Sequence, residues 1–71
     1  MSKQILAPMP GKINSIIVAA GAEVLAKQEL FIMESMKMEM PIVAPVAGTV
    51  DQIQVSEGQS VDKDTVLATI V

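Results

Sequence analysis

The chain contains the stretch Ala7-Pro8-Met9-Pro10-Gly11 and, 37 positions later, the related stretch Ala44-Pro45-Val46-Ala47-Gly48. Shifting the whole sequence by the same 37 positions aligns residues 1–34 with residues 38–71 without a gap. Further identical pairs are Ile5/Ile42, Ile16/Ile53, Val18/Val55, Gly21/Gly58, Val24/Val61 and Leu30/Leu67. A fixed period indicates an internal structural repeat. We therefore expect two equivalent halves related by a pseudo-twofold axis.

The two halves are joined only by the tripeptide Ser35-Met36-Lys37. The run 29–44 is longer than a typical strand, so the chain must reverse within it, and the repeat puts this reversal at the tripeptide. A two-residue hairpin loop there would hold Met36 and Lys37 at a positive φ, where Asn-Gly or Asp-Gly is normally found. Each such non-glycine residue costs about 1–2 kcal/mol, and strain kept at an exposed tip indicates function.

Within each half the pattern is typical of short β-strands. Apolar and polar residues alternate, or nearly alternate, in residues 12–16 and 49–55. Other expected strands are short pieces around Val24 and Val61 and the segments 30–33 and 66–71, with turns at 19–21 and 56–58 and corners at 26–28 and 63–65. No segment favours a helix of ten or more residues. The sequence predicts an all-β domain over residues 1–71, built as two small packed sheets or a flattened barrel.

Composition excludes several classes of function. The 71 residues contain no Cys and no His, which removes disulfides, thiolate and imidazole metal ligands, and Ser-His-Asp catalysis. A net charge of −3 without Arg, Trp or Tyr argues against nucleic acid as a partner. No apolar run approaches the roughly 18 residues of a membrane-spanning helix, and we find no signal-peptide core. We expect a soluble, cytoplasmic protein without a metal site, catalytic residues or membrane insertion.

The methionines near the joint allow two interpretations. Alternation of Met36, Met38, Met40 and Ile42 is typical of a strand that turns one face to the core and the polar residues to water. We favour this interpretation for the last three residues, but it fails for Met36, which it would bury inside the turn. Lys37, taken alone, would ordinarily be a solvated charge.

In these motifs the sequence resembles the biotinyl and lipoyl carrier domains, and among them the biotin carboxyl carrier type. The family pattern opens with Ala-Pro-x-x-Gly, here residues 7–11, and continues with Gly-x-x-Val, here Gly21-Ala22-Glu23-Val24. It then reaches Glu-Ala-Met-Lys-Met, which reads Glu34-Ser35-Met36-Lys37-Met38 in this chain. The second half repeats the opening at 44–48 and 58–61, so the resemblance covers essentially the whole chain.

The resemblance implies a fold, a barrel-sandwich hybrid of two four-stranded sheets related by a pseudo-dyad. It also implies an attachment site at Lys37, where a biotin protein ligase would join the lysine Nζ to the carboxyl group of biotin in an amide. Met36 and Met38 would serve as flanking recognition residues, and Glu34 and Ser35 would complete the hairpin motif. The attached biotin would carry CO2 between a biotin carboxylase and a carboxyltransferase or decarboxylase. The chain itself would then be a non-catalytic carrier.

Three residues depart from the family pattern. Ser35 stands where the family most often has Ala, a small-for-small change that should leave the hairpin accessible. Lys27 and Asp64 stand at corners that usually carry Gly, at a cost of up to about 1–2 kcal/mol if φ remains positive there. The chain also lacks the protruding loop of some bacterial acetyl-CoA carboxylase carriers, which weakens an assignment to that enzyme.

Two alternatives remain at the level of sequence. A lipoyl domain has the same fold and the same lysine position, but its hairpin usually reads Asp-Lys-Ala, whereas Met flanks Lys37 on both sides. An unmodified module, such as the hybrid domain of membrane-fusion adaptor proteins, has no reason to keep Met-Lys-Met at its tip. Among biotin enzymes, the sequence does not distinguish acetyl-, propionyl-, pyruvate- or urea-type carboxylases from one another or from decarboxylases.

Overall fold

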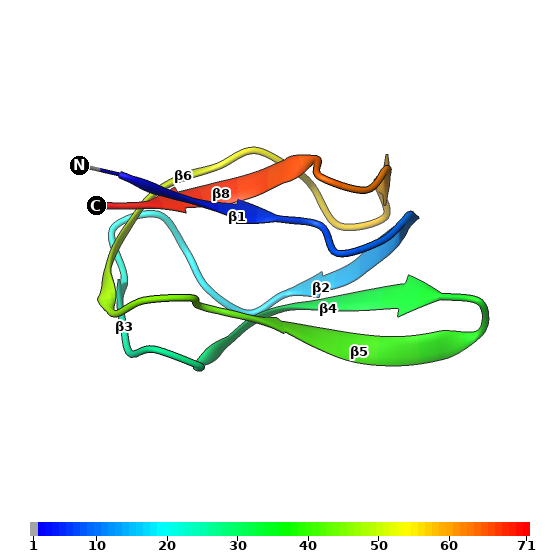
Figure 1. The fold of residues 1–71 in the computed structure, drawn as a ribbon, viewed down its shortest axis with the longest axis horizontal. Helices are drawn as coiled ribbons and strands as arrows, with labels where there is room; N and C mark the ends of the chain where they lie inside the picture. Colours follow the sequence, from blue (N-terminus) through cyan, green and yellow to red (C-terminus); the bar gives the residue numbers. More distant parts are fainter. Residues whose placement is uncertain (1) are drawn as a thin grey trace.

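The alternation of apolar and polar residues produces short strands throughout the chain, as expected. The computed structural model describes residues 2–71. Its strands are β1 (Lys3–Leu6), β2 (Gly11–Ile16), β3 (Glu23–Val24), β4 (Glu29–Ser35), β5 (Met38–Val43), β6 (Gly48–Ile53), β7 (Ser60–Val61) and β8 (Val66–Ile70). They form two four-stranded antiparallel sheets (Figure 1), which confirms the all-β class and the two-sheet architecture. In this part of the chain no helix has the length and apolarity needed to cross a membrane.

The two sheets are copies of each other in strand order. One has the order β1-β8-β6-β3 and the other β5-β4-β2-β7, so each strand of one half takes the place of its counterpart in the other half. Backbone hydrogen bonds repeat in the same way. The amide of Gly21 donates to the carbonyl of Val50 at 2.7 Å, and the amide of Gly58 donates to the carbonyl of Ile13 at 2.7 Å. The predicted pseudo-twofold repeat is therefore confirmed.

The core lies between the sheets and is built from equivalent residues of the two halves. Ile13 and its counterpart Val50 are buried, as are Leu30 and its counterpart Leu67, and Phe31, the one aromatic residue, is buried completely. Burying a large apolar side chain contributes about 1.5–3 kcal/mol, so these few positions dominate the stability of so small a chain. The remaining buried residues are Ile5, Ala7, Val24, Met33, Ile42, Ala44, Val55, Val61, Ala68 and Ile70.

Three strands differ clearly from the sequence expectation. Strand β4 covers Glu29–Ser35 and not only the expected 30–33, because its pairing with β5 continues to Ser35. Strand β1 pairs with β8 but was not among the expected strands, because Ile5 is its only buried residue and gives too short an alternation to identify. Strand β6 ends at Ile53, whereas the expected strand continued to residue 55. The chain leaves the strand there, yet Val55 is still buried, so its apolar character reflects the core and not continued pairing.

The molecule is elongated, with extents of 32 × 17 × 17 Å along its principal axes. Figure 1 shows the turn between β4 and β5 at one end of the long axis, and the start of β1 and the C-terminus at the other. The same view shows the β4–β5 hairpin reaching farther along this axis than the strands of the other sheet. The joint between the two halves is therefore the most projecting part of the fold at its end of the molecule.

Candidate functional site

The projecting turn consists of two residues in left-handed conformation. Ser35 and Met38 are the last paired residues of the β4–β5 ladder, and between them Met36 has φ 54° and Lys37 has φ 64°. Two successive residues with positive φ give the backbone twist that matches a two-residue hairpin. The predicted reversal and its positive φ values are confirmed, although Ser35 belongs to β4 and the loop itself is only Met36-Lys37.

The side chains at this tip are largely exposed to solvent. The exposed fraction is 89% for Met36 and 68% for Met38, and Lys37 is exposed as well. The core-face interpretation is therefore wrong for Met38. It holds farther along β5, where Met40 is half-buried against the core and Ile42 is buried. The physical reason is the projection of the hairpin, which at its turn reaches beyond the strands of the other sheet (Figure 1).

The base of the tip depends on a close approach between β2 and β4. A Cβ atom at Gly11 would lie 2.6 Å from the carbonyl oxygen of Glu34 and 3.2 Å from Cε of Met33. Only a glycine can occupy this point without displacing the backbone of β4. At the equivalent point of the other half, a Cβ atom at Gly48 would lie 2.6 Å from the carbonyl oxygen of Val71. The two glycines of the Ala-Pro-x-x-Gly motifs therefore serve strand packing.

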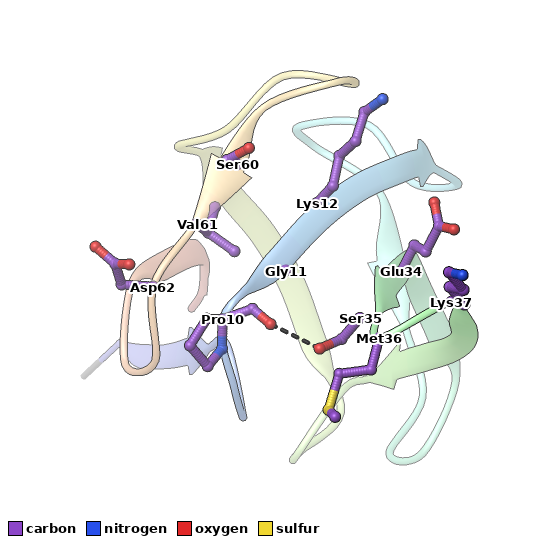
Figure 2. Close-up of a pocket in the computed structure, with 10 residues that line it drawn as sticks. All are labelled: Pro10, Gly11, Lys12, Glu34, Ser35, Met36, Lys37, Ser60, Val61 and Asp62. Carbon is purple, nitrogen blue, oxygen red and sulfur yellow. Dashed lines mark hydrogen bonds between the residues drawn. The ribbon is translucent and has the colours of Figure 1, made fainter.

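A hydrogen bond ties the tip to the loop before β2. The Oγ of Ser35 donates to the carbonyl oxygen of Pro10 at 2.8 Å (Figure 2). An alanine at this position could not make the bond. Serine therefore gives this chain a connection between the hairpin and the β1–β2 loop.

Two carboxylates face each other directly behind the turn. Glu34 of β4 and Glu39 of β5 are partners in the ladder, and the side-chain amide of Asn14 lies close to both. Its Nδ2 donates to Oε2 of Glu39 at 3.1 Å and to Oε1 of Glu34 at 3.5 Å. Sequence reasoning identified Glu34 but missed Asn14 and Glu39. The three are brought together only by strand pairing, since Asn14 lies 20 and 25 residues from the two glutamates in sequence.

An open, shallow groove of about 580 Å³ runs from the tip toward β7. The tip residues 34–37 line one side of it, and Lys12, Ser60 and Asp62 line the other (Figure 2). The groove is open to solvent. Among residues 2–71, no three potential ligands gather to hold a metal ion.

The chemical group that this end of the molecule offers is therefore the primary amine of Lys37. It stands on a two-residue turn whose flanking strands are fixed by the ladder, by Ser35 and by Asn14. Of the other lysines, Lys3 and Lys12 lie within strands, and Lys27 and Lys63 lie at corners. An exposed amine on a defined turn is well suited to covalent attachment of a carboxylic acid through an amide.

Comparison with known proteins agrees with this description of the site. The sequence model of the family described as "Biotin-requiring enzyme" matches residues 3–70. The chain is 52% identical over 64 residues to the biotin carboxyl carrier protein of Streptococcus mutans, covering 90% of this chain and 49% of that protein. It is 40% identical over 67 residues to mitochondrial pyruvate carboxylase of Homo sapiens, covering 94% of this chain and 6% of that protein. The chain thus spans about half the length of the carrier protein and a small part of the length of the pyruvate carboxylase.

A solved structure supports the same relationship. The crystal structure of Kluyveromyces lactis urea carboxylase superimposes with a TM-score of 0.94 at 28% identity, covering 100% of this chain and 6% of that one. The two folds therefore agree over the entire length of this chain.

Proposed function

This chain belongs to the biotin-attachment family whose sequence model it matches, as a biotin carrier domain, and from this membership we propose that Lys37 is the residue that holds the biotin. The observation that carries the proposal is the exposed Met36-Lys37 turn at the projecting end of the fold. The residues present fit the group, because Met36 and Lys37 are both exposed, so that the lysine side chain can extend into another protein. Biotin, not lipoate, is the cofactor, in agreement with the carboxylases and the carrier protein among the relatives.

Attachment would use biotinyl-adenylate bound to a biotin protein ligase. A lysine amine is protonated at neutral pH, so the ligase must first remove a proton from the ammonium group. The neutral amine of Lys37 would then attack the acyl carbon, with a C–N bond formed as the C–O bond to the adenylate breaks and AMP leaves. Loss of a second proton from nitrogen completes the amide. The chain contributes the position of the amine, and the ligase contributes its activation.

The neighbours of Lys37 would determine recognition. Met36 and Met38 expose flexible apolar side chains on both sides of the lysine, and methionine adapts readily to irregular apolar surfaces. Glu34 adds a negative charge behind the turn, and Ser35 fixes the hairpin through its bond to Pro10. These four residues would therefore form the surface that the ligase and the partner enzymes contact.

The loaded domain would transport a carboxyl group. Biotin supplies the ability to accept CO2 and release it, and the projecting tip lets one attached group reach the active sites of a biotin carboxylase and of a carboxyltransferase or decarboxylase. Tethering raises the effective concentration of the group at each site. Residues 1–71 would act as one non-catalytic carrier domain. The absence of Cys fits a reducing, cytoplasmic compartment.

Enzymatic biotinylation of the purified chain tests this assignment. Incubation with a biotin protein ligase, ATP and biotin should add one biotinyl group, found by intact mass and placed on Lys37 by peptide mapping. The Lys37→Arg variant should remain unmodified, and the control Lys63→Arg should be modified like the parent. Label on Lys27 or Lys63, or modification of Lys37→Arg, would refute the assignment. Lipoylation by a lipoate ligase at a comparable rate would contradict the assignment of biotin as the cofactor.

A further inference from the structure

Asn14 occupies a bulge in β2. In the β2–β4 ladder, Ile13 pairs with Met33 but the next pair is Ser15 with Ile32, so Asn14 is the extra residue without a partner. Bulges locally redirect a side chain and are common beside functional sites. Here the redirected side chain reaches the two glutamates behind the attachment turn.

The contacts of Asn14 join the two strands that carry the tip. Glu34 lies on β4 and Glu39 on β5, one pair behind the Ser35/Met38 pair that closes the hairpin. Like charges directly opposite each other in an antiparallel ladder are destabilising. A side-chain amide has two N–H donors, so Asn14 can satisfy one oxygen of each carboxylate and hold both in place.

The other half of the fold provides an internal comparison. Its β6–β8 ladder has the same irregularity, with Val50 paired to Ile70 and Gln52 paired to Thr69, so Asp51 occupies the equivalent bulge. The positions equivalent to Glu34 and Glu39 are Val71 and Ser2, whose side chains carry no charge. Within residues 2–71 this bulge occurs at Asn14 and at Asp51, but among them only Asn14 places an amide against two carboxylates. The bulge itself accepts an aspartate.

We infer that Asn14 is a positioning residue for the attachment turn, which holds Glu34 and Glu39 together so that Lys37 is presented to the ligase in one geometry. The inference rests on the proposed function of Lys37. Without the amide, repulsion between the two carboxylates separates the ends of β4 and β5, and the turn samples more arrangements. A partner that binds only one arrangement of the turn then has a lower apparent affinity, because only the fraction of molecules in that arrangement can bind it. The amine itself is unchanged.

The test uses Asn14→Asp, which replaces the two donors with a third carboxylate. We expect the apparent KM for enzymatic biotinylation to rise about fivefold, the equivalent of roughly 1 kcal/mol of like-charge repulsion, with kcat changed less than about twofold. Amide exchange at Ser35 and Met38, the pair that closes the hairpin in the unmodified chain, should accelerate to a similar extent. Adding Glu39→Gln to Asn14→Asp should restore most of the KM, because it removes one of the charges.

Two further variants act as controls. Asp51→Asn changes the equivalent bulge away from the tip and should leave KM and exchange at the tip at parent values. Asn14→Leu removes both donors without adding charge, so its KM should lie between that of the parent and that of Asn14→Asp. Because Asp51 already occupies the equivalent bulge, Asn14→Asp should fold, which the urea midpoint verifies.

Each result decides whether Asn14 positions the attachment turn. Parent values of KM and of amide exchange in Asn14→Asp would overturn the positioning role and leave the function of Lys37 intact. Equal effects of Asp51→Asn would also overturn it, because the role would then be general stability. If the parent chain is not biotinylated at Lys37, the proposed function fails, and amide exchange at the tip still decides whether Asn14 orders the turn.

Discussion

Lys27 and Asp64 occupy equivalent corners of the two halves and share a left-handed backbone, with φ 70° and 68°. Their amides make equivalent bonds across the pseudo-dyad, Lys27 to the carbonyl of Ala44 at 2.7 Å and Asp64 to the carbonyl of Ala7 at 2.8 Å. Neither residue is a glycine, the residue that adopts this conformation without strain. The hydrogen bond from each corner to the other half therefore requires the left-handed backbone at that corner, whether the residue is lysine or aspartate.

Replacing these corner residues with glycine should stabilise the domain unequally. Lys27→Gly should raise the free energy of unfolding by about 1 kcal/mol, because a lysine pays the full left-handed cost. Asp64→Gly should gain only about 0–0.5 kcal/mol, because aspartate tolerates this region better. Urea denaturation measures both, with Lys63→Gly as a control that should be neutral or slightly destabilising. A larger gain for Asp64→Gly than for Lys27→Gly would contradict the explanation.

Adding a methyl group at either close approach should destabilise the fold, with different consequences for the site. Gly11→Ala and Gly48→Ala should each cost about 1–3 kcal/mol, as overpacking does, because each Cβ would meet a backbone oxygen at 2.6 Å. Only Gly11 contacts the base of the tip. Gly11→Ala should therefore also slow biotinylation of the folded protein, while Gly48→Ala should not. Denaturation midpoints and ligase kinetics together separate the two effects.

Three methionines should divide into one structural and two functional residues. Met33 is fully buried, so Met33→Ala should cost about 2–5 kcal/mol. Met36→Ala and Met38→Ala should each remain within about 0.5 kcal/mol of the parent, since both side chains are exposed. Both should nevertheless weaken modification by the ligase and carboxyl transfer with a partner enzyme. Unfolding of Met36→Ala, with normal modification of the folded remainder, would show that the methionine supports the core instead.

Loss of the Ser35 hydroxyl should have a small effect. Ser35→Ala removes the bond to Pro10, and at this exposed position we expect a loss of about 0.5 kcal/mol, the low end for a hydrogen bond. The β4–β5 ladder still holds the hairpin without this bond, so the KM for biotinylation should change less than about twofold. Ser35→Thr, which keeps the hydroxyl, is the matched control. A fivefold or greater change in KM for Ser35→Ala would show that recognition depends on this bond.

Much of this fold could be predicted because its requirements are local or periodic. Alternation identified β2 and most of β6, and the 37-residue repeat located the reversal at Ser35-Met36-Lys37, where composition alone showed no turn. The short strand β1 could not be predicted, because its one buried residue, Ile5, forms no alternating pattern. Exposure of Met38 also escaped, because alternation shows which face a residue occupies but not whether another sheet covers it.

The sequence by itself determined the all-β class, the two equivalent halves and the lysine at their joint, because repeated residues impose the same backbone requirements wherever they occur. Only the tertiary structure decided which side chains surround that lysine. Asn14 meets Glu34 and Glu39, and Ser35 meets Pro10, through strand pairings that bring together residues 20 to 25 positions apart. Such contacts depend on strand register and on a bulge, and neither leaves a signal in consecutive residues.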